Sequence, residues 1–360
     1  MVVDLPQTPP TATIDLSAYR RNLARLAARV APCALMAVVK ADAYGHGLVP
    51  IARAAVAAGI EWIGTIGVET GLELRRNGIP RDVVVLTWQL APNEDYAAAI
   101  EAELDFGVST IGQLEEIAAV GASRRARVHL KIDTGLHRNG ASVEEWPALV
   151  ARALALSRSM EIVGVWTHIA EASESEDSAA IDRFSAALVV AEELGASLTV
   201  RHLGASAAAF TRADARFDLV RIGAFSYGIS PGDGVSPSSL GLEPVMTLTA
   251  PVTAVNLGMA TIAIGYGDGI PSAAAGRLRL VIDGRPYPIV SVQLDRLTVD
   301  IGDATVRPGD TATLFGSGAH GEPTLQDWAD ALGTIGEEIV TRLSPRIRRR
   351  FFSESVELDR

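Results

Sequence analysis

The chain has 360 residues, of which 48% are hydrophobic and 21% are charged, and its formal net charge is −11. This length suffices for one large and one smaller domain, and the balance of residues is that of a folded globular protein. The negative charge argues against a nucleic-acid surface, which needs clustered Lys and Arg. Cys33 is the only cysteine, which excludes an intrachain disulfide and a cysteine metal cluster. The N-terminus has neither a positive leader nor an apolar stretch, so we expect a cytoplasmic protein without a membrane partner.

Short apolar runs alternate with Ala- and Leu-rich amphipathic stretches from about residue 34 to residue 223, which is the pattern of repeated βα units. The predicted strands are 34–40, 61–66, 83–87, 104–108, 128–132, 162–168, 198–203 and 219–223. The predicted helices include 48–58, 68–77, 110–120, 143–158 and 177–194. Eight such units predict an α/β fold of the (β/α)8 TIM-barrel type, with its active site at the C-terminal ends of the strands. A doubly wound open sheet is the alternative, but no Gly-x-Gly-x-x-Gly follows the first strand.

The pattern changes after about residue 240, where β-rich runs at short spacing predict a small all-β domain. These runs are 245–255, 261–265, 278–282, 287–294, 296–301 and 311–315, and a helix is predicted over 325–332. We therefore expect a barrel domain over 12–238 and a C-terminal β domain over 239–360, with which residues 1–11 are able to pair. A strand is predicted over 11–15, and the basic run 346–350 is expected to be solvated or to contact another subunit.

Lys40 is the most informative position, because it lies where an apolar strand-like run gives way to a turn that contains Gly and His. Its ammonium would emerge at the end of a strand, where burial lowers the pKa of a lysine. A partly neutral lysine attacks carbonyls and forms a Schiff base, most familiarly with pyridoxal phosphate. The alternative is an exposed lysine that only ends a strand.

Other polar residues follow the predicted strands, and in a barrel the strand ends share one mouth. They are Tyr44, Lys131, Arg138, Thr167, His168, His202, Ser206, Arg221 and Gly223. Ser206 and Gly223 fall in the loops after strands seven and eight, where this fold often binds phosphate. Taken singly, a histidine here is more often a core residue and a serine a helix cap. Together they supply a Schiff-base lysine, a phosphate cup, one arginine for a carboxylate and one for a cofactor ring.

The run 39–47, Val-Lys-Ala-Asp-Ala-Tyr-Gly-His-Gly, resembles the cofactor-lysine signature of alanine racemases. The resemblance continues in family order through 131–138, 166–168, 220–228 and 264–269. It implies a pyridoxal 5'-phosphate-binding barrel, a C-terminal β domain and a homodimer with active sites shared between subunits. It also implies an amino-acid substrate, alanine by default, and a role in making D-alanine for peptidoglycan.

The resemblance also implies roles for individual residues. Lys40 would hold the cofactor, and Tyr266, from the partner subunit, would be the second base, since racemisation removes a proton from one face of Cα and returns it to the other. A chain from Tyr266 through His168 to Arg221 would help the phenol act as a base, and Arg221 would contact the ring nitrogen. Because arginine stays protonated, it leaves that nitrogen neutral and disfavours transamination.

The remaining implied roles concern the substrate and the phosphate. Arg138 would bind the substrate carboxylate, and Lys131, at a position often carbamylated in the family, would hold Arg138 in place. The main chain at Leu294 would reach the partner's substrate carboxylate. The cofactor phosphate would be held by Tyr44, Ser206, Ile222 and Gly223.

Several positions depart from the family pattern. Leu294 stands where the family usually has methionine, Glu337 where it has tyrosine, Ala205 where it has asparagine and His137 where it has a small residue. These changes leave open a racemase for serine or a larger amino acid, and a paralogue that binds the cofactor without racemising. A decarboxylase of the same barrel type is disfavoured, because such enzymes place an acid rather than Arg221 at the ring nitrogen.

Overall fold

The structure is a computed structural model that describes residues 9–232 and 234–353. The chain forms two compact units. One contains Leu23–Lys40 and Ala52–Gly223, and the other contains the chain up to Asn22, Ala41–Ile51 and the chain from Ala224 on. The predicted domain ranges, 12–238 and 239–360, are each continuous in sequence, whereas each compact unit is assembled from separate segments of the chain. The predicted ranges remain a proposal.

The first unit is built around a sheet of eight parallel strands. They are β2 (Ala34–Val38), β3 (Trp62–Ile66), β4 (Val84–Trp88), β5 (Leu104–Val108), β6 (Ala126–Lys131), β7 (Met160–Trp166), β8 (Val200–His202) and β9 (Leu219–Ile222). They pair in the order β8-β7-β6-β5-β4-β3-β2-β9. Backbone hydrogen bonds from Asp218 N to Arg201 O and from Arg221 N to Gly204 O, both 3.0 Å, join the two edges. The predicted (β/α)8 barrel is confirmed.

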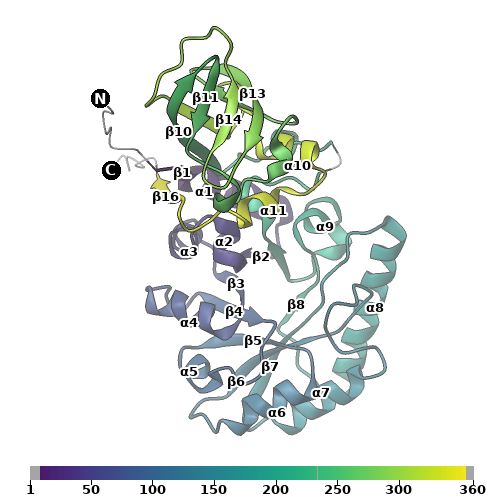
Figure 1. Ribbon diagram of the computed structural model, residues 1–360. Helices are drawn as coiled ribbons and strands as arrows, with labels where there is room; N and C mark the ends of the chain where they lie inside the picture. The colour runs from purple at the N-terminus through teal and green to yellow at the C-terminus, as the bar shows by residue number, and fades with distance from the viewer. Residues whose placement is uncertain (1–8, 233, 354–360) are drawn as a thin grey trace, which may run out of the picture. The chain divides into compact units, whose positions relative to one another are not determined.

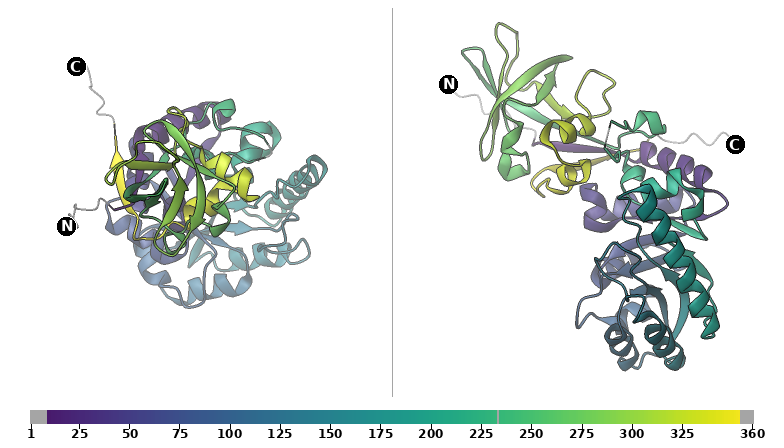
Figure 2. Two further views of the ribbon diagram at one scale, coloured as in Figure 1. Left: turned by 45° about the horizontal axis from the view of Figure 1, so that its top comes forward. Right: turned by 90° about the vertical axis from the view of Figure 1, so that its right-hand side faces the viewer.

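Helices cover the outside of these strands, as Figure 1 shows for α4 to α8. The longest of them, α8, has 20 residues, and Figure 2 shows it as a teal helix beside the strands. The helices that follow the strands are α3 (Leu48–Ala57), α4 (Val68–Arg76), α5 (Tyr96–Glu101), α6 (Ile111–Ala119), α7 (Trp146–Ala155), α8 (Glu174–Glu193) and α9 (Ser206–Thr211). Side chains of Asp95, Thr110 and Ser173 cap α5, α6 and α8 by accepting main-chain N–H groups. The sequence analysis did not predict α5, whose six residues are too few for a periodic signal.

The second unit holds the other sheet, in the order β11-β14-β13-β12-β15-β10-β1-β16. Its strands are β1 (Thr11–Asp15), β10 (Met246–Asn256), β11 (Met259–Ile262), β12 (Arg279–Ile282), β13 (Arg285–Val292), β14 (Leu297–Asp300), β15 (Thr311–Phe315) and β16 (Arg348–Phe352). The expected C-terminal β fold is confirmed, and its helix is α10 (Leu325–Leu332). The basic run was not predicted as a strand, yet β16 pairs in parallel with β1, with most of its side chains exposed.

Burial patterns explain why the two sheets read differently in sequence. All five residues of β5 are buried, as expected of a parallel strand covered on both faces. In β10 buried and half-buried residues alternate over Met246–Thr253, as expected of an antiparallel strand with one face to the core. The remaining helices are α1 (Leu16–Val30), α2 (Lys40–Gly45) and α11 (Gly336–Thr341). Among the described residues, no helix is both long and apolar enough to cross a bilayer.

Candidate active site

Lys40 follows the end of β2, where Val39 N still bonds to Gly64 O of the neighbouring strand at 2.8 Å. The next four residues, 41–44, form a left-handed turn with φ of 52–54° and ψ of 41–54°. Left-handed helical geometry costs roughly 1–2 kcal/mol for each residue with a side chain, so it persists only where its surroundings enforce it. The chain thus leaves the strand through a fixed turn immediately after Lys40.

Hydrogen bonds within this turn hold it in place. The Asp42 carboxylate accepts the Leu48 N–H at 2.7 Å, and the Asp42 carbonyl accepts the Gly47 N–H at 2.9 Å. His46 Nδ1 lies 2.8 Å from the Tyr44 carbonyl oxygen, and the His46 ring is buried. Together these bonds account for the strained backbone.

Arg221 is the buried centre of the barrel mouth, with 4% of its surface exposed. Its Nη2 donates to Thr167 O at 2.8 Å and to Leu203 O at 3.1 Å, and it lies 3.0 Å from His168 Nδ1. Burial lowers the pKa of Arg221 to about 9. The guanidinium is therefore held by main-chain carbonyls from two strand ends, with His168 as its neighbour.

The pKa of His168 reflects the positive charge around the barrel mouth. Burial, followed by the charges of four surrounding cations, lowers its pKa to about 2, so the ring is neutral. The four cations are Arg221, Arg138, Lys131 and Lys40. Two carboxylates oppose these four basic side chains: Asp133 acts on Lys131, and Glu171 acts on Arg221. This excess of basic side chains favours an anionic ligand, such as one with a phosphate or a carboxylate group.

Lys131, the last residue of β6, is buried with its ammonium 4.5 Å from the centre of the Trp166 ring, and it donates to the side-chain oxygen of Asn139. Burial, and then the charges of Arg221 and Arg138, lowers the pKa of Lys131 to about 7. Lys40 and Lys131 are the only two lysines in the sequence. Both of its lysine amines therefore belong to this mouth.

The loops after β8 and β9 have the expected polar groups. Gly223 N donates to Ser206 Oγ at 3.1 Å, and Ile222 is the last residue of β9. The Glu171 carboxylate, which the sequence analysis did not single out, accepts the Ala208 N–H of α9 at 2.7 Å, and burial raises its pKa. The start of α9 therefore already donates a main-chain N–H to one carboxyl group.

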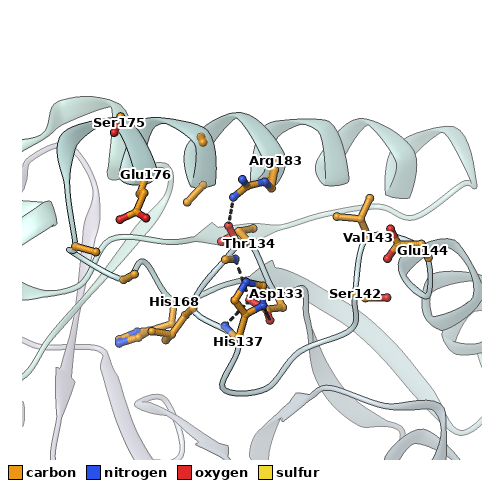
Figure 3. A pocket seen from close by; sticks show the side chains of 16 residues that line it. Asp133, Thr134, His137, Ser142, Val143, Glu144, His168, Ser175, Glu176 and Arg183 are labelled. Carbon is orange, nitrogen blue, oxygen red and sulfur yellow. Dashed lines mark hydrogen bonds and ion pairs between the residues drawn. The ribbon is translucent and has the colours of Figure 1, made fainter.

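A cavity of about 610 Å³ adjoins the mouth and is lined by the loop after β6, by His168 and by α8 (Figure 3). The Asp133 carboxylate shapes the loop by accepting the N–H groups of Gly135 at 2.9 Å and His137 at 3.1 Å. Arg183 reaches down from α8 to the Thr134 carbonyl at 2.6 Å (Figure 3). His137, one of the departures from the family pattern, lines this cavity, and its side chain is 84% exposed.

Tyr266 lies in the second unit, on a short turn that is fixed by the strand ends beside it. Tyr266 N donates to Gln293 O and Gly267 N donates to Leu294 O, both at 2.8 Å. The Tyr266 and Leu294 side chains are 53% and 58% exposed. The two residues that the family resemblance assigns to the partner's site thus sit together on one exposed surface.

Tyr44 also belongs to the second unit, where its ring centre lies 5.0 Å from that of Tyr227. Burial, and then the charge of Glu337, raises the pKa of Tyr44. Glu337 therefore lies close to one of the groups predicted to hold phosphate.

The structure brings together eight of the predicted residues at the strand ends of the first unit. They are Lys40, Lys131, Arg138, His168, Ser206, Arg221, Ile222 and Gly223. Tyr44, Tyr266 and Leu294 belong to the second unit. The sequence analysis missed Asp105 and His129 inside the barrel, although Arg127, His129 and Lys131 alternate on one face of β6 and so carried a period-two signal.

A closed barrel with a lysine-bearing cationic mouth, joined to a β sheet that presents a tyrosine, defines a class of barrel enzyme acting on anionic small molecules. The family described as "Alanine racemase, N-terminal domain" matches residues 14–231, and "Alanine racemase, C-terminal domain" matches residues 247–351. The chain therefore belongs to the alanine racemase family, whose members are isomerases that racemise amino acids.

Individual relatives agree along nearly the whole chain. A protein of Thermobifida fusca named alanine racemase is 45% identical over 366 residues, which cover 94% of this chain and 96% of the relative. The crystal structure of alanine racemase from Streptomyces lavendulae has a TM-score of 0.93 at 39% identity, covering 96% of this chain and 98% of that one. Alanine racemase from Streptomyces coelicolor has a TM-score of 0.92 at 40% identity, with the same coverage.

Proposed function

We propose that this enzyme interconverts L- and D-alanine with pyridoxal 5'-phosphate, using Lys40 and Tyr266 as bases on opposite faces of the substrate. The observation that carries the proposal is the mouth itself. A fixed left-handed turn follows Lys40, and the basic side chains around His168 outnumber the carboxylates that oppose them. Such a mouth suits a phosphate, a carboxylate and an amine in one small site.

The residues present fit the cofactor. Lys40 would bind its aldehyde carbon, and Tyr44, Ser206, Ile222 and Gly223 would hold its phosphate through hydroxyl and main-chain donors. When bound, the cofactor withdraws electrons from the amino-acid Cα and so makes the Cα proton acidic. All the other work falls to the side chains of the protein.

Two of those side chains would move the proton. Once the substrate amine has replaced it on the cofactor, the freed amine of Lys40 would remove or return the proton on one face of Cα. Tyr266, supplied by the second subunit of a homodimer, would do so on the other face. Half-exposure of Tyr266 supports this division, because a base that serves another subunit must be presented on the surface. Neutral His168, in contact with Arg221, accepts a hydrogen bond from the guanidinium and offers its other ring nitrogen to the phenol.

Arg221 would limit the chemistry to proton movement. Its guanidinium donates hydrogen bonds and cannot accept one, so it leaves the cofactor's ring nitrogen unprotonated. An acid at this position would make the ring a stronger electron sink and favour transamination or decarboxylation. The main-chain carbonyls that hold Arg221 therefore support a racemase over a decarboxylase.

Arg138 and Leu294 would bind the substrate carboxylate, Arg138 within the chain and the Leu294 main chain from the partner. Lys131 would add CO2 to its neutral amine, releasing a proton and leaving a carbamate that holds Arg138 in place. A pKa of about 7 supports this step, because only the neutral amine reacts. We further infer a cytoplasmic enzyme without a nucleic-acid or membrane partner, which serves the synthesis of D-alanine.

A panel of L- and D-amino acids, incubated with the purified enzyme in D2O, tests the function. We expect deuterium at Cα and loss of optical rotation for alanine. Exchange confined to serine or a larger amino acid would mean that this amino acid, and not alanine, is the substrate. Bound cofactor without exchange for any amino acid would favour the non-racemising paralogue.

A further inference from the structure

A chain of buried hydrogen bonds crosses the barrel interior, from Arg221 at the mouth to the N-terminal end of β5. Nη1 of Arg221 lies 3.4 Å from Nδ1 of His202, and Nε2 of His202 lies 3.0 Å from Nδ1 of His129. Nε2 of His129 lies 3.1 Å from a carboxylate oxygen of Asp105. The two histidines are fully buried, and Asp105 is 1% exposed.

The two ends of this chain determine where its protons lie. Arginine can only donate and an ionised carboxylate can only accept. His202 must therefore accept at Nδ1 and donate from Nε2, and His129 must accept at Nδ1 and donate from Nε2 to Asp105. Each ring then carries its proton on Nε2. Burial lowers the pKa of His202 well below its usual value, which favours the neutral form of that ring.

Packing prevents either ring from escaping this arrangement by rotating. Trp166 stacks on His202 at 4° between planes, with 5.6 Å between ring centres, and Trp62 meets His129 edge-on at 88°. Gly164 makes room for His129, because a Cβ there would lie 2.7 Å from its Nδ1. When Asp105 is changed, His129 and His202 are therefore expected to respond by a change of tautomer and not by rotation of the ring.

Asp105 is anchored from the N-terminal end of the barrel. Arg127 donates to its two oxygens at 2.7 and 3.3 Å and to Glu161 at 3.0 Å. Asp105 and Arg127 line a cavity of about 430 Å³ at the N-terminal ends of the strands. The neighbouring Arg125 also reaches this cavity, but it pairs with Glu161 at 2.8 Å.

We propose that Asp105 and His129 are positioning residues for Arg221: they fix the tautomer of His202 that accepts from the guanidinium, and so aim Arg221 at the cofactor's ring nitrogen. The inference rests on the proposed function for what Arg221 does, and it extends the site across the barrel. Without Asp105, His129 can carry its proton on Nδ1. His202 then carries its own proton on Nδ1, facing a guanidinium that has only donors.

The test compares Asp105→Leu and Arg127→Gln with Arg125→Gln, a matched loss of a neighbouring arginine that does not touch Asp105. Histidine-selective 15N NMR on the cofactor-free enzyme, which has six histidines, reads the tautomers directly. We expect Nε2–H for both rings in the wild type and in Arg125→Gln, and a shift toward Nδ1–H in Asp105→Leu. Arg127→Gln is expected to shift His129 in the same direction by less, and it keeps the proposal testable if Asp105→Leu fails to fold.

Cofactor rebinding to the same proteins gives the second measurement. Loss of an outer partner of a metal ligand weakens metal binding by about tenfold or more. By analogy we expect about a tenfold loss of cofactor affinity in Asp105→Leu, a smaller loss in Arg127→Gln and none in Arg125→Gln. Nδ1–H tautomers in the wild type, or equal binding by all variants, would overturn the proposal. If the tautomers are as expected but no amino acid exchanges its Cα proton, the positioning chain stands and the racemase proposal fails.

Discussion

The barrel mouth and the exposed turn that carries Tyr266 hold the two proposed bases in opposite surroundings. Lys40 stands among buried, mutually constrained groups, and its neighbours lower the pKa values of Lys131 and His168. Tyr266 is 53% exposed, on a turn held by main-chain hydrogen bonds and by the Asp268 carboxylate, which accepts the Gly265 N–H at 3.0 Å. If the proposed function holds, each chain would preform its own cofactor pocket and present the second base to its partner. The difference in exposure between the two residues is what such a shared site would need.

Removing the lysine gives the largest expected effect. In Lys40→Ala we expect racemisation to fall by at least ~10²–10⁴-fold, the range of a lost acid–base group, together with loss of the covalent link to the cofactor. Borohydride reduction followed by peptide mass spectrometry measures that link. Lys131→Ala is the control. The sequence has only two lysines, so Lys40 is the single lysine left in this variant, and the label should still be found at residue 40. Labelling at Lys131 in the wild type would reverse the two assignments.

Removing the phenol oxygen of Tyr266 tests the role of the exposed second base. Tyr266→Phe should lower racemisation by roughly 10²–10⁴-fold while the cofactor's absorbance persists. In D2O, exchange of the Cα proton should be lost from one alanine enantiomer and retained from the other, because Lys40 still serves its own face. Equal loss from both enantiomers would contradict the assignment of one base to each face. Tyr287→Phe, which changes a buried tyrosine elsewhere in the same sheet, is the control.

The turn that presents Tyr266 has no room for extra atoms, although its tyrosine is exposed. A Cβ at Gly265 would lie 2.2 Å from Gln293 O and 2.6 Å from Leu294 O. Gly265→Ala should therefore displace the turn and cost roughly 1–3 kcal/mol, the range for overpacking. Racemisation should fall while the cofactor absorbance stays. Gly112→Ala in α6, whose nearest neighbour would be 3.9 Å away, should not lower the unfolding midpoint and should leave racemisation unchanged. Wild-type stability and activity of Gly265→Ala would show that the turn can accommodate the added methyl group.

Lys131 should carry its carbamate at a pH where ordinary lysines do not. Its pKa of about 7 leaves the amine mostly neutral above pH 7, and the ordinary value is about 10.4. Protonation below pH 7 removes the reactive form, so the carbamate should increase as pH rises from 6 to 8. 13C NMR with labelled bicarbonate measures it, and Lys131→Ala should lack the signal. A signal that is absent at pH 8, or that does not change with pH, would exclude the carbamate.

Much of the fold could be predicted from the sequence, because the strands of both sheets are apolar runs of the expected period. The strand β5, for example, occupies the predicted range, 104–108. The pairing of β16 with β1 could not be predicted, because it joins the two ends of the chain and leaves exposed arginines on a strand. Local sequence carries little information about such a distant partner.

The mouth was predictable for a similar reason: strand ends in a barrel converge, so a polar residue at each end marks the site. The chain of Asp105, His129 and His202 was harder to see, because its members are separated by 24 and 73 residues and lie inside strands. A buried histidine in a strand is usually read as core. The left-handed turn after Lys40 was also missed, since Ala, Asp and Tyr rarely adopt it.

Glu337 offers the smallest effect and the one most specific to this sequence. Its carboxylate raises the pKa of Tyr44, a proposed phosphate ligand, and so it should also repel the phosphate. Two like charges about 8 Å apart at an intermediate dielectric interact by about 1 kcal/mol, so Glu337→Gln should tighten cofactor binding about fivefold. Glu338→Gln is the control, because that carboxylate pairs with Arg342 at 3.5 Å and hydrogen-bonds Thr334. Fluorescence titration of the cofactor-free proteins measures both. Unchanged or weaker binding in Glu337→Gln would mean that the acid faces away from the phosphate, and the departure from the family pattern would then concern the substrate entrance alone.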